Sequence, residues 1–130
     1  MMDTTGEKMK KQYRVKKSNE IESILKNRKY SSNSYFTIYK KNNKETSHFR
    51  YAMSVNKKIG HAVVRNRLKR QVRAIVRKLN IIDNVDIFII VRNKILNLSY
   101  QEMKKNLEDL FKKQRLIKKG ENDDSIYQQK

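Results

Sequence analysis

The chain has 130 residues, the size of one small domain, and its formal net charge is +19 at pH 7. It contains no cysteine, which excludes disulfides and thiolate metal sites, and no apolar run approaches the ~20 residues that a transmembrane helix needs. A charge this high points to a nucleic-acid partner rather than a membrane, and without an apolar leader segment we expect a cytoplasmic protein.

The first elements in chain order are a polar tail and a short helix. Residues 1–12 are polar and aperiodic, so we expect a disordered N-terminal tail before a domain that spans 13–117. Ser18 is typical of a helix N-cap, and Ile21 and Leu25 belong to the apolar stripe that follows it. This pattern predicts an amphipathic helix that covers a sheet and ends near position 27 or 28.

Two stretches of alternating apolar and polar residues, 34–40 and 48–56, predict two β-strands. The loop between them is polar, so we expect a hairpin-like connection and direct pairing of the two strands. One side of each strand should enter the core, with Phe36, Ile38, Phe49, Tyr51, Met53 and Val55. The other side should form a polar face near the basic helix that follows, with Thr37, Tyr39, Arg50 and Ser54. A tyrosine there can stack on unpaired bases or cap the core edge, and its position alone does not decide between these roles.

The most informative stretch is 56–78, which contains nine basic residues and no acidic one. Its apolar residues recur every three or four positions, which predicts a helix with one buried side. A turn of about 100° per residue places the polar and basic residues opposite that side, with Arg65 and Arg67 at the margins. The opposite side contains Asn66, Lys69, Arg70, Arg73 and Arg77. Most charged helix faces are merely solvated, but those faces mix both signs, so this one predicts contact with a polyanion.

The remaining elements are a strand and a second long helix. Residues 85–91 form a nearly continuous apolar run, typical of a strand buried on both sides. Ser99 and Glu102 form a capping box, which predicts a helix start with an apolar stripe that ends near Phe111. We expect residues 118–130 to fray. The whole chain is therefore an α+β, single-domain sandwich of order α-β-β-(β)-α-β-α, in which one short strand remains unplaced.

The stretch 57–73, KKIGHAVVRNRLKRQVR, resembles the signature of the protein component of bacterial ribonuclease P. It shares the K-K-I-G turn, the Arg-Asn-Arg triplet and the spacing of the following basic residues, and residues from about 14 to 117 fit the family's pattern. His61 departs from that pattern, because the family commonly has Asn there, and the change would alter how the helix start is capped. The resemblance implies a left-handed β-α-β crossover, whereas the general preference is right-handed.

The resemblance also implies a function. In this family the RNA subunit is the catalyst and removes the 5′ leader of precursor tRNA, so the protein alone should be inactive. We expect the catalytic RNA and precursor tRNA as partners, no obligatory protein partner, and Mg²⁺ as a cofactor held mainly by the RNA. The positions that match the RNA-contacting signature are Lys57, Lys58, Arg65, Asn66, Arg67, Lys69, Arg70 and Arg73. The positions that match the leader cleft are Thr37 and Tyr39, together with Ile21 and Leu25, which are often Phe in relatives and cannot stack on bases here.

The residues by themselves show no catalytic constellation. His48 and His61 fall on a strand and at a helix start, and neither paired acids nor a zinc-ligand pattern is visible, so no metal site is assigned. Two alternatives therefore stay open. One is a ribosomal or RNA-chaperone protein that only holds folded rRNA. The other is a stand-alone ribonuclease that uses His48 or His61 as acid or base.

Overall fold

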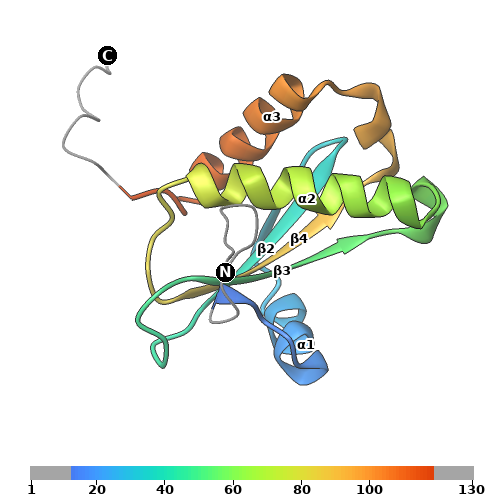
Figure 1. The fold of residues 1–130 in the computed structure, drawn as a ribbon. Coiled ribbons are helices and arrows are strands. Elements are labelled where there is room, and N and C mark those ends of the chain that lie inside the picture. The colour runs from blue at the N-terminus through green and yellow to red at the C-terminus, as the bar shows by residue number, and fades with distance from the viewer. Residues whose placement is uncertain (1–12, 119–130) are drawn as a thin grey trace, which may run out of the picture.

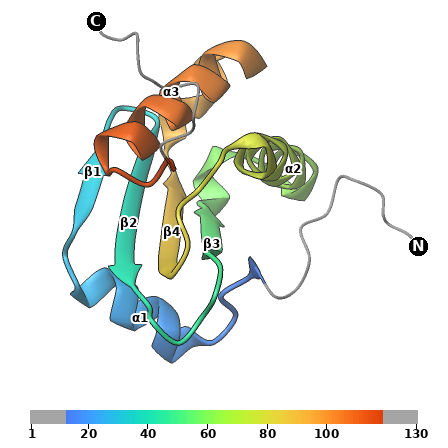
Figure 2. The same cartoon turned by 90° about the vertical axis from the view of Figure 1, so that its left-hand side faces the viewer.

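The computed structural model describes residues 13–118, so the predicted tails at 1–12 and 119–130 lie outside the described residues. A four-stranded sheet has helix α1 on one face and helices α2 and α3 on the other (Figures 1 and 2). The elements, including two short 3₁₀ helices, are α1 (Ser18–Lys26), β1 (Tyr30–Ser32), β2 (Phe36–Asn42), β3 (Arg50–Val55), η2 (Lys57–Ile59), α2 (Ala62–Lys78), β4 (Val85–Val91), η3 (Asn93–Asn97) and α3 (Tyr100–Lys113).

The strand order in the sheet is β1-β2-β4-β3 (Figure 2). Strand β4 is antiparallel to β2 and parallel to β3, so the predicted hairpin between β2 and β3 is wrong. The alternation within a strand shows which side chains face the core, but it does not identify the neighbouring strand. The strand that the sequence left unplaced is β1, which pairs with β2 at the edge of the sheet.

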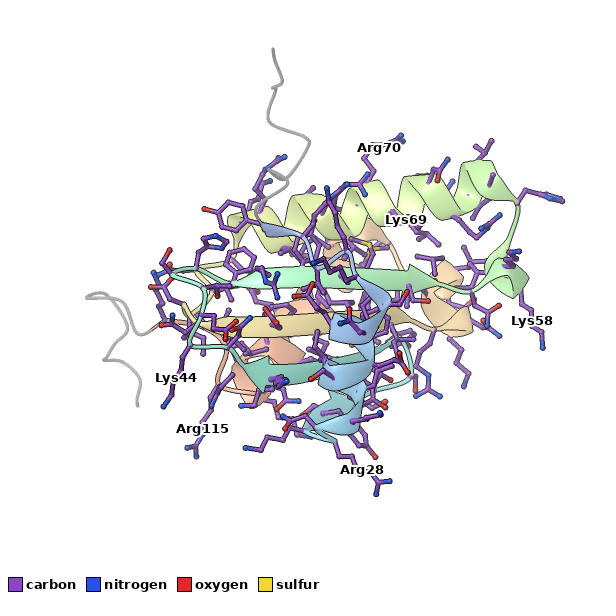
Figure 3. All side chains as sticks on the ribbon, turned by 90° about the horizontal axis from the view of Figure 1, so that it is seen from below. Arg28, Lys44, Lys58, Lys69, Arg70 and Arg115 are labelled. Atoms are coloured by element: carbon purple, nitrogen blue, oxygen red, sulfur yellow. The ribbon has the colours of Figure 1, made fainter. Side chains whose placement is uncertain are left out.

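Helix α2 connects the parallel neighbours β3 and β4. Figure 3 views the sheet from the α1 side, with β3 and β4 running side by side in the same direction and α2 on the far side. A chain that leaves β3, passes through α2 behind the sheet and returns to β4 in this arrangement makes a left-handed turn. The crossover that the resemblance implied is therefore confirmed, and it departs from the general right-handed preference.

The main core lies between the sheet and helices α2 and α3. The predicted strand side chains are confirmed there, because Phe36, Ile38, Tyr51 and Val55 are buried. Phe49 and Met53 are partly buried against them. Helices α2 and α3 add the following buried residues: Leu68, Val72, Ile75, Val76, Met103, Leu107, Leu110 and Phe111. Helix α2 therefore packs by one side only, and its basic side stays at the surface.

The helix starts agree with the sequence prediction only in part. At α3 the capping box is confirmed: the Ser99 hydroxyl accepts from the Glu102 amide at 3.2 Å, and the Glu102 carboxylate accepts from the Ser99 amide at 2.9 Å. At α1 the N-cap is Lys17, not Ser18, which is already the first helical residue and makes no capping bond. At α2 the N-cap is His61, whose side chain makes no capping bond either.

Candidate RNA-binding surfaces

The first candidate surface is the exposed side of α2 together with η2, and we call it the α2 surface. It brings together all eight residues that match the RNA-contacting signature. Lys57, Lys58, Asn66, Arg67 and Arg70 are exposed, whereas Arg65, Lys69 and Arg73 are half-buried. Within residues 13–118 the ion pairs involve only Arg50 and Lys118 as cations. The cations of the α2 surface therefore have no carboxylate partner there, and Lys58 and Arg70 point away from the protein in Figure 3.

Several contacts fix the backbone of the turn before α2, from which Lys57 and Lys58 extend. The Asn56 side chain caps η2 by accepting from the Lys58 amide at 2.8 Å, and Ile59 anchors the turn in the core. A Cβ at Gly60 would lie 3.0 Å from the Val64 Cβ, so any larger residue would push this turn away from the helix. The Arg65 guanidinium donates to the Gly60 carbonyl at 3.1 Å and closes the turn.

The second candidate surface lies on the other face of the sheet, beside α1, and we call it the α1 cleft. Ile21 and Leu25 of α1 and Tyr39 of β2 are partly buried in one cluster there, around Ile24 and Phe88. The sequence predicted that this face is polar and lies near the basic helix. Instead it contains an apolar cluster, and it lies on the side of the sheet opposite to α2. Helix α2 packs on the face that contains Phe36 and Ile38, and alternation along β2 places Tyr39 and Thr37 on the opposite face.

All four predicted cleft residues thus share one face of the molecule, and the structure adds an aromatic neighbour. Thr37 lies on the Tyr39 side of β2, and its hydroxyl is 3.0 Å from that of Ser32. The ring of Tyr30 lies 5.1 Å from the ring of Tyr39, at an interplanar angle of 31°. Tyr30 is 56% exposed. The sequence did not indicate a role for Tyr30, because its strand is only three residues long.

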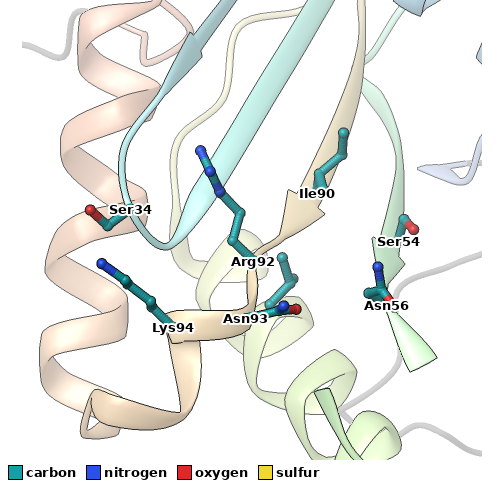
Figure 4. A pocket seen from close by; sticks show the side chains of 8 residues that line it. Ser34, Ser54, Asn56, Ile90, Arg92, Asn93 and Lys94 are labelled. Carbon is teal, nitrogen blue, oxygen red and sulfur yellow. The ribbon is translucent and has the colours of Figure 1, made fainter. Parts of the chain in front are cut away.

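A polar cavity of about 480 Å³ lies at the carboxyl ends of β3 and β4, where Ser54 and Ile90 extend the α1 face of the sheet (Figure 4). Two cations line it, Arg92 and Lys94. The Arg92 guanidinium donates to the Ser32 hydroxyl at 3.0 Å and to the Asn33 carbonyl at 3.1 Å, so it is held against the β1–β2 turn. Arg92 and Lys94 follow the end of β4, so the periodicity of a strand did not identify them in the sequence.

A buried ion-pair network fixes α1 to the sheet. Arg50 donates to both carboxylate oxygens of Asp86, at 3.0 and 2.9 Å, and to Glu20 in the first turn of α1 at 3.0 Å. The Asn43 amide adds a bond of 3.0 Å to Asp86. These acceptors raise the pKa of Arg50, Asp86 above all. Arg50, predicted on a polar face, is therefore neutralised by protein carboxylates and is not available to RNA.

The described residues do not suit a resident metal ion. Residues 13–118 contain no group of three or more His, Asp or Glu side chains that could hold one. Glu20 and Asp86 do approach each other, but both bind the Arg50 guanidinium, which already neutralises them. Because this donor set is unsuitable, we assign no magnesium ligands within residues 13–118.

The two histidines cannot act as a pair. His48 lies just before β3, with its Nδ1 2.8 Å from the Phe49 carbonyl and its ring 4.7 Å from the Tyr13 ring. His61 lies beyond the other end of β3, exposed at the start of α2.

No helix in the described part of the chain is long and apolar enough to span a membrane.

The fold and its surfaces define a class: a small basic α+β protein with a cationic helix on one face of its sheet and an aliphatic and aromatic cleft on the other. A family model described as Ribonuclease P matches residues 9–115. The chain therefore belongs to the ribonuclease P protein family.

Individual relatives support the same family assignment. The ribonuclease P protein component of Lactococcus lactis subsp. lactis is 41% identical over 116 residues, which cover 88% of this chain and 98% of the relative. A solved Staphylococcus aureus RNase P protein, a mutant with defective mRNA degradation activity, has a TM-score of 0.77 at 36% identity and covers 82% of this chain and 92% of its own. The Thermotoga maritima RNase P protein has a TM-score of 0.69 at 28% identity, with coverages of 77% and 96%.

Proposed function

We propose that the protein acts in ribonuclease P by binding the catalytic RNA with its α2 surface and the 5′ leader of precursor tRNA with its α1 cleft. As a family member, the chain is a protein subunit of ribonuclease P, the endoribonuclease that matures tRNA 5′ ends. The observation that carries the proposal is the separation of two chemically different surfaces by one sheet.

The chemistry of the α2 surface supports contact with a folded RNA. Arginine suits phosphate because its planar fork donates two hydrogen bonds at once, and the flanking lysines add point charges. Asn66 lies among these cations, where its amide can both donate to phosphate and accept from a sugar hydroxyl. Because protein carboxylates do not neutralise these cations within residues 13–118, their charge is available to phosphates.

The α1 cleft supports contact with an unpaired strand. Unpaired bases stack on aromatic side chains, and such contacts tolerate different sequences. Ile21 and Leu25 offer apolar contact without stacking, so the stacking falls to Tyr39 and its neighbour Tyr30. Arg92 and Lys94, at the end of this face, provide positive charge for the phosphates of the same strand.

The protein assists the cleavage and the RNA performs it. In this family the hydrolysis of the phosphodiester uses Mg²⁺. The described residues contain no group of side chains that could hold this ion. We therefore assign the metal ions to the RNA subunit. The same role places the protein in the bacterial cytoplasm, where precursor tRNA is made.

A reconstitution experiment tests the proposal. The full-length protein, a bacterial ribonuclease P RNA and a precursor tRNA are combined, and 5′-leader release is measured at low magnesium. We expect no cleavage by protein alone and a clear increase when protein joins the RNA. Cleavage by RNA-free protein would instead favour a stand-alone nuclease. Binding to rRNA without any effect on leader release would favour the ribosomal alternative.

A further inference from the structure

A third basic surface lies at the free edge of β1, and we call it the β1-edge surface. It consists of Arg28, Lys29, Lys40 and Arg115. The Lys40 amide donates to the Lys29 carbonyl at 3.0 Å, which places these two residues side by side at the end of β1. The Lys40 ammonium donates to the Gln114 carbonyl at 2.6 Å, so Arg115 is adjacent as well. Arg28, Lys29 and Arg115 are exposed and therefore open to a ligand.

The described part of the chain does not neutralise these charges. Its ion pairs involve only Arg50 and Lys118 as cations. Lys29 lies opposite Lys40, one step beyond the ladder between β1 and β2, and like charges at opposite positions destabilise a sheet. Burial lowers the pKa of Lys40, and the neighbouring charges of Lys29 and Arg115 lower it further. A negatively charged partner would relieve this repulsion.

The two arginines of the β1-edge surface occupy backbone positions that favour other residues. Arg28 and Arg115 follow the ends of α1 and α3, with φ angles of 58° and 59°. This left-handed conformation after a helix favours Gly or Asn, because a Cβ is crowded there. A cation near a helix C-terminus is favourable, but Lys26, Lys112 and Lys113 already supply it. Arginine at both positions therefore points to a function of the side chains.

The β1-edge surface is separate from the α2 surface. Strand β1 and helix α2 lie at opposite sides of the molecule in Figure 2. In Figure 3, Arg28 and Arg115 lie at the edge of the protein opposite Arg70. An RNA that binds the α2 surface therefore leaves the β1 edge facing away from it.

The β1-edge surface continues the α1 cleft. Tyr30, whose ring lies 5.1 Å from the Tyr39 ring in the cleft, directly follows Lys29. In the other direction along β1, the Ser32 hydroxyl accepts from Arg92 at 3.0 Å. A strand advances about 3.3 Å per residue, so only about 10 Å of backbone separates Ser32 from Lys29. An unpaired RNA strand that follows β1 therefore meets Arg92, then the two tyrosines, and then the β1-edge surface.

The position of α2 gives this path a direction. The cavity that Arg92 lines is also lined by Asn56, whose side chain caps η2 in the α2 surface. The Arg92 end of the path is therefore near the α2 surface, and the β1 edge is far from it. With the catalytic RNA on the α2 surface, the part of the leader farthest from that RNA is its 5′ end.

We propose that the β1-edge surface binds the backbone phosphates of the leader beyond the α1 cleft, toward the leader's 5′ end. The bases stack on Tyr30 and Tyr39, and the strand then passes over the free edge of β1. There Arg28, Lys29 and Arg115 contact its phosphates. Phosphate contacts carry no base identity, so this surface accepts leaders of different sequence. The inference rests on the proposed function and extends the leader site beyond the cleft.

The first test combines arginine variants with a series of leader lengths. Precursor tRNAs whose leaders are shortened stepwise from the 5′ end are bound to enzyme reconstituted with wild type, Arg28→Asn, Arg115→Asn or the control Lys105→Gln. Lys105 is exposed on α3, ten residues before Arg115 and thus about 15 Å away along the helix.

We expect each arginine variant to weaken binding of the full-length leader about three- to five-fold. Each should bind a leader that ends within the cleft as tightly as wild type does, and Lys105→Gln should follow wild type at every length. Equal losses for long and short leaders would overturn the proposal, and so would the absence of any loss.

The second test separates a ligand-binding arginine from a structural one. Asparagine tolerates the left-handed conformation, so Arg28→Asn and Arg115→Asn should unfold at the wild-type temperature or above it. A lower unfolding temperature together with weaker binding of every leader would make the arginines structural and overturn the proposal.

The third test concerns the other RNA. Both arginine variants should bind the catalytic RNA alone as tightly as wild type does. A loss there equal to the loss for precursor tRNA would assign the surface to the catalytic RNA and overturn the leader assignment. If wild-type protein promotes leader release but the variants match Lys105→Gln at every leader length, this inference fails and the proposed function stands. If wild-type protein fails to promote leader release, the proposed function fails, and this inference with it.

Discussion

Removing the Asp86 carboxylate tests how α1 is held on the sheet. In Asp86→Ala, Arg50 loses two hydrogen bonds of 3.0 and 2.9 Å and keeps only Glu20. The side chains of Arg50 and Asp86 are 17% and 7% exposed, so the pair is largely shielded from water. Breaking a buried pair from one side costs about 3–5 kcal/mol, and the remaining contact with Glu20 puts this variant near the lower end.

Two further variants complete the test. Glu20 is one-third exposed, so Glu20→Gln should cost less than about 1 kcal/mol of unfolding free energy. The double variant Arg50→Ala/Asp86→Ala should lose less than the sum of its two single variants, because neither charge is left alone. Urea denaturation followed by circular dichroism measures all of these. A cost below about 1 kcal/mol for Asp86→Ala, or strict additivity in the double variant, would refute the reasoning.

Three other predictions concern single side chains. Tyr39→Ala should weaken binding of precursor tRNA to the reconstituted enzyme by about 1–3 kcal/mol and spare mature tRNA; an equal loss for both would make Tyr39 a core-edge residue. Arg70→Ala should flatten the dependence of catalytic-RNA affinity on salt by somewhat under one unit of log–log slope, whereas an unchanged slope would mean that Arg70 does not contact a phosphate. Ser99→Ala should cost about 1 kcal/mol in urea denaturation because it removes the cap of α3, and a neutral result would contradict the capping assignment.

The sequence predicted those features that depend on local periodicity. The apolar repeat of α2 identified its buried residues, such as Leu68 and Val72, and therefore its basic side. Alternation in β2 and β3 identified Phe36, Ile38 and Tyr51 as core residues. These patterns are local because a side chain's face is set by its neighbours within one element.

The sequence did not predict features that depend on which elements meet. Helix α2 packs its apolar side on the face of the sheet that contains Phe36 and Ile38, which leaves Tyr39 on the opposite face, beside α1. A cavity beside the edge of β3 is lined by Arg14, Tyr51 and Arg73, which lie far apart in the chain. The structure places the predicted residues of the α2 surface and those of the α1 cleft on separate faces. Their contacts with RNA remain predictions.

The central place of β4 has a consequence for synthesis of the chain on the ribosome. Strands β2 and β3 emerge first, yet neither has its long partner until residues 85–91 have followed. During that interval the two alternating segments are neighbours in sequence and free to pair as the hairpin that their pattern favours. Such a pairing must open before β4 can enter between them. A nascent chain that stops before β4 therefore cannot form this sheet, and the domain can be completed only late in translation.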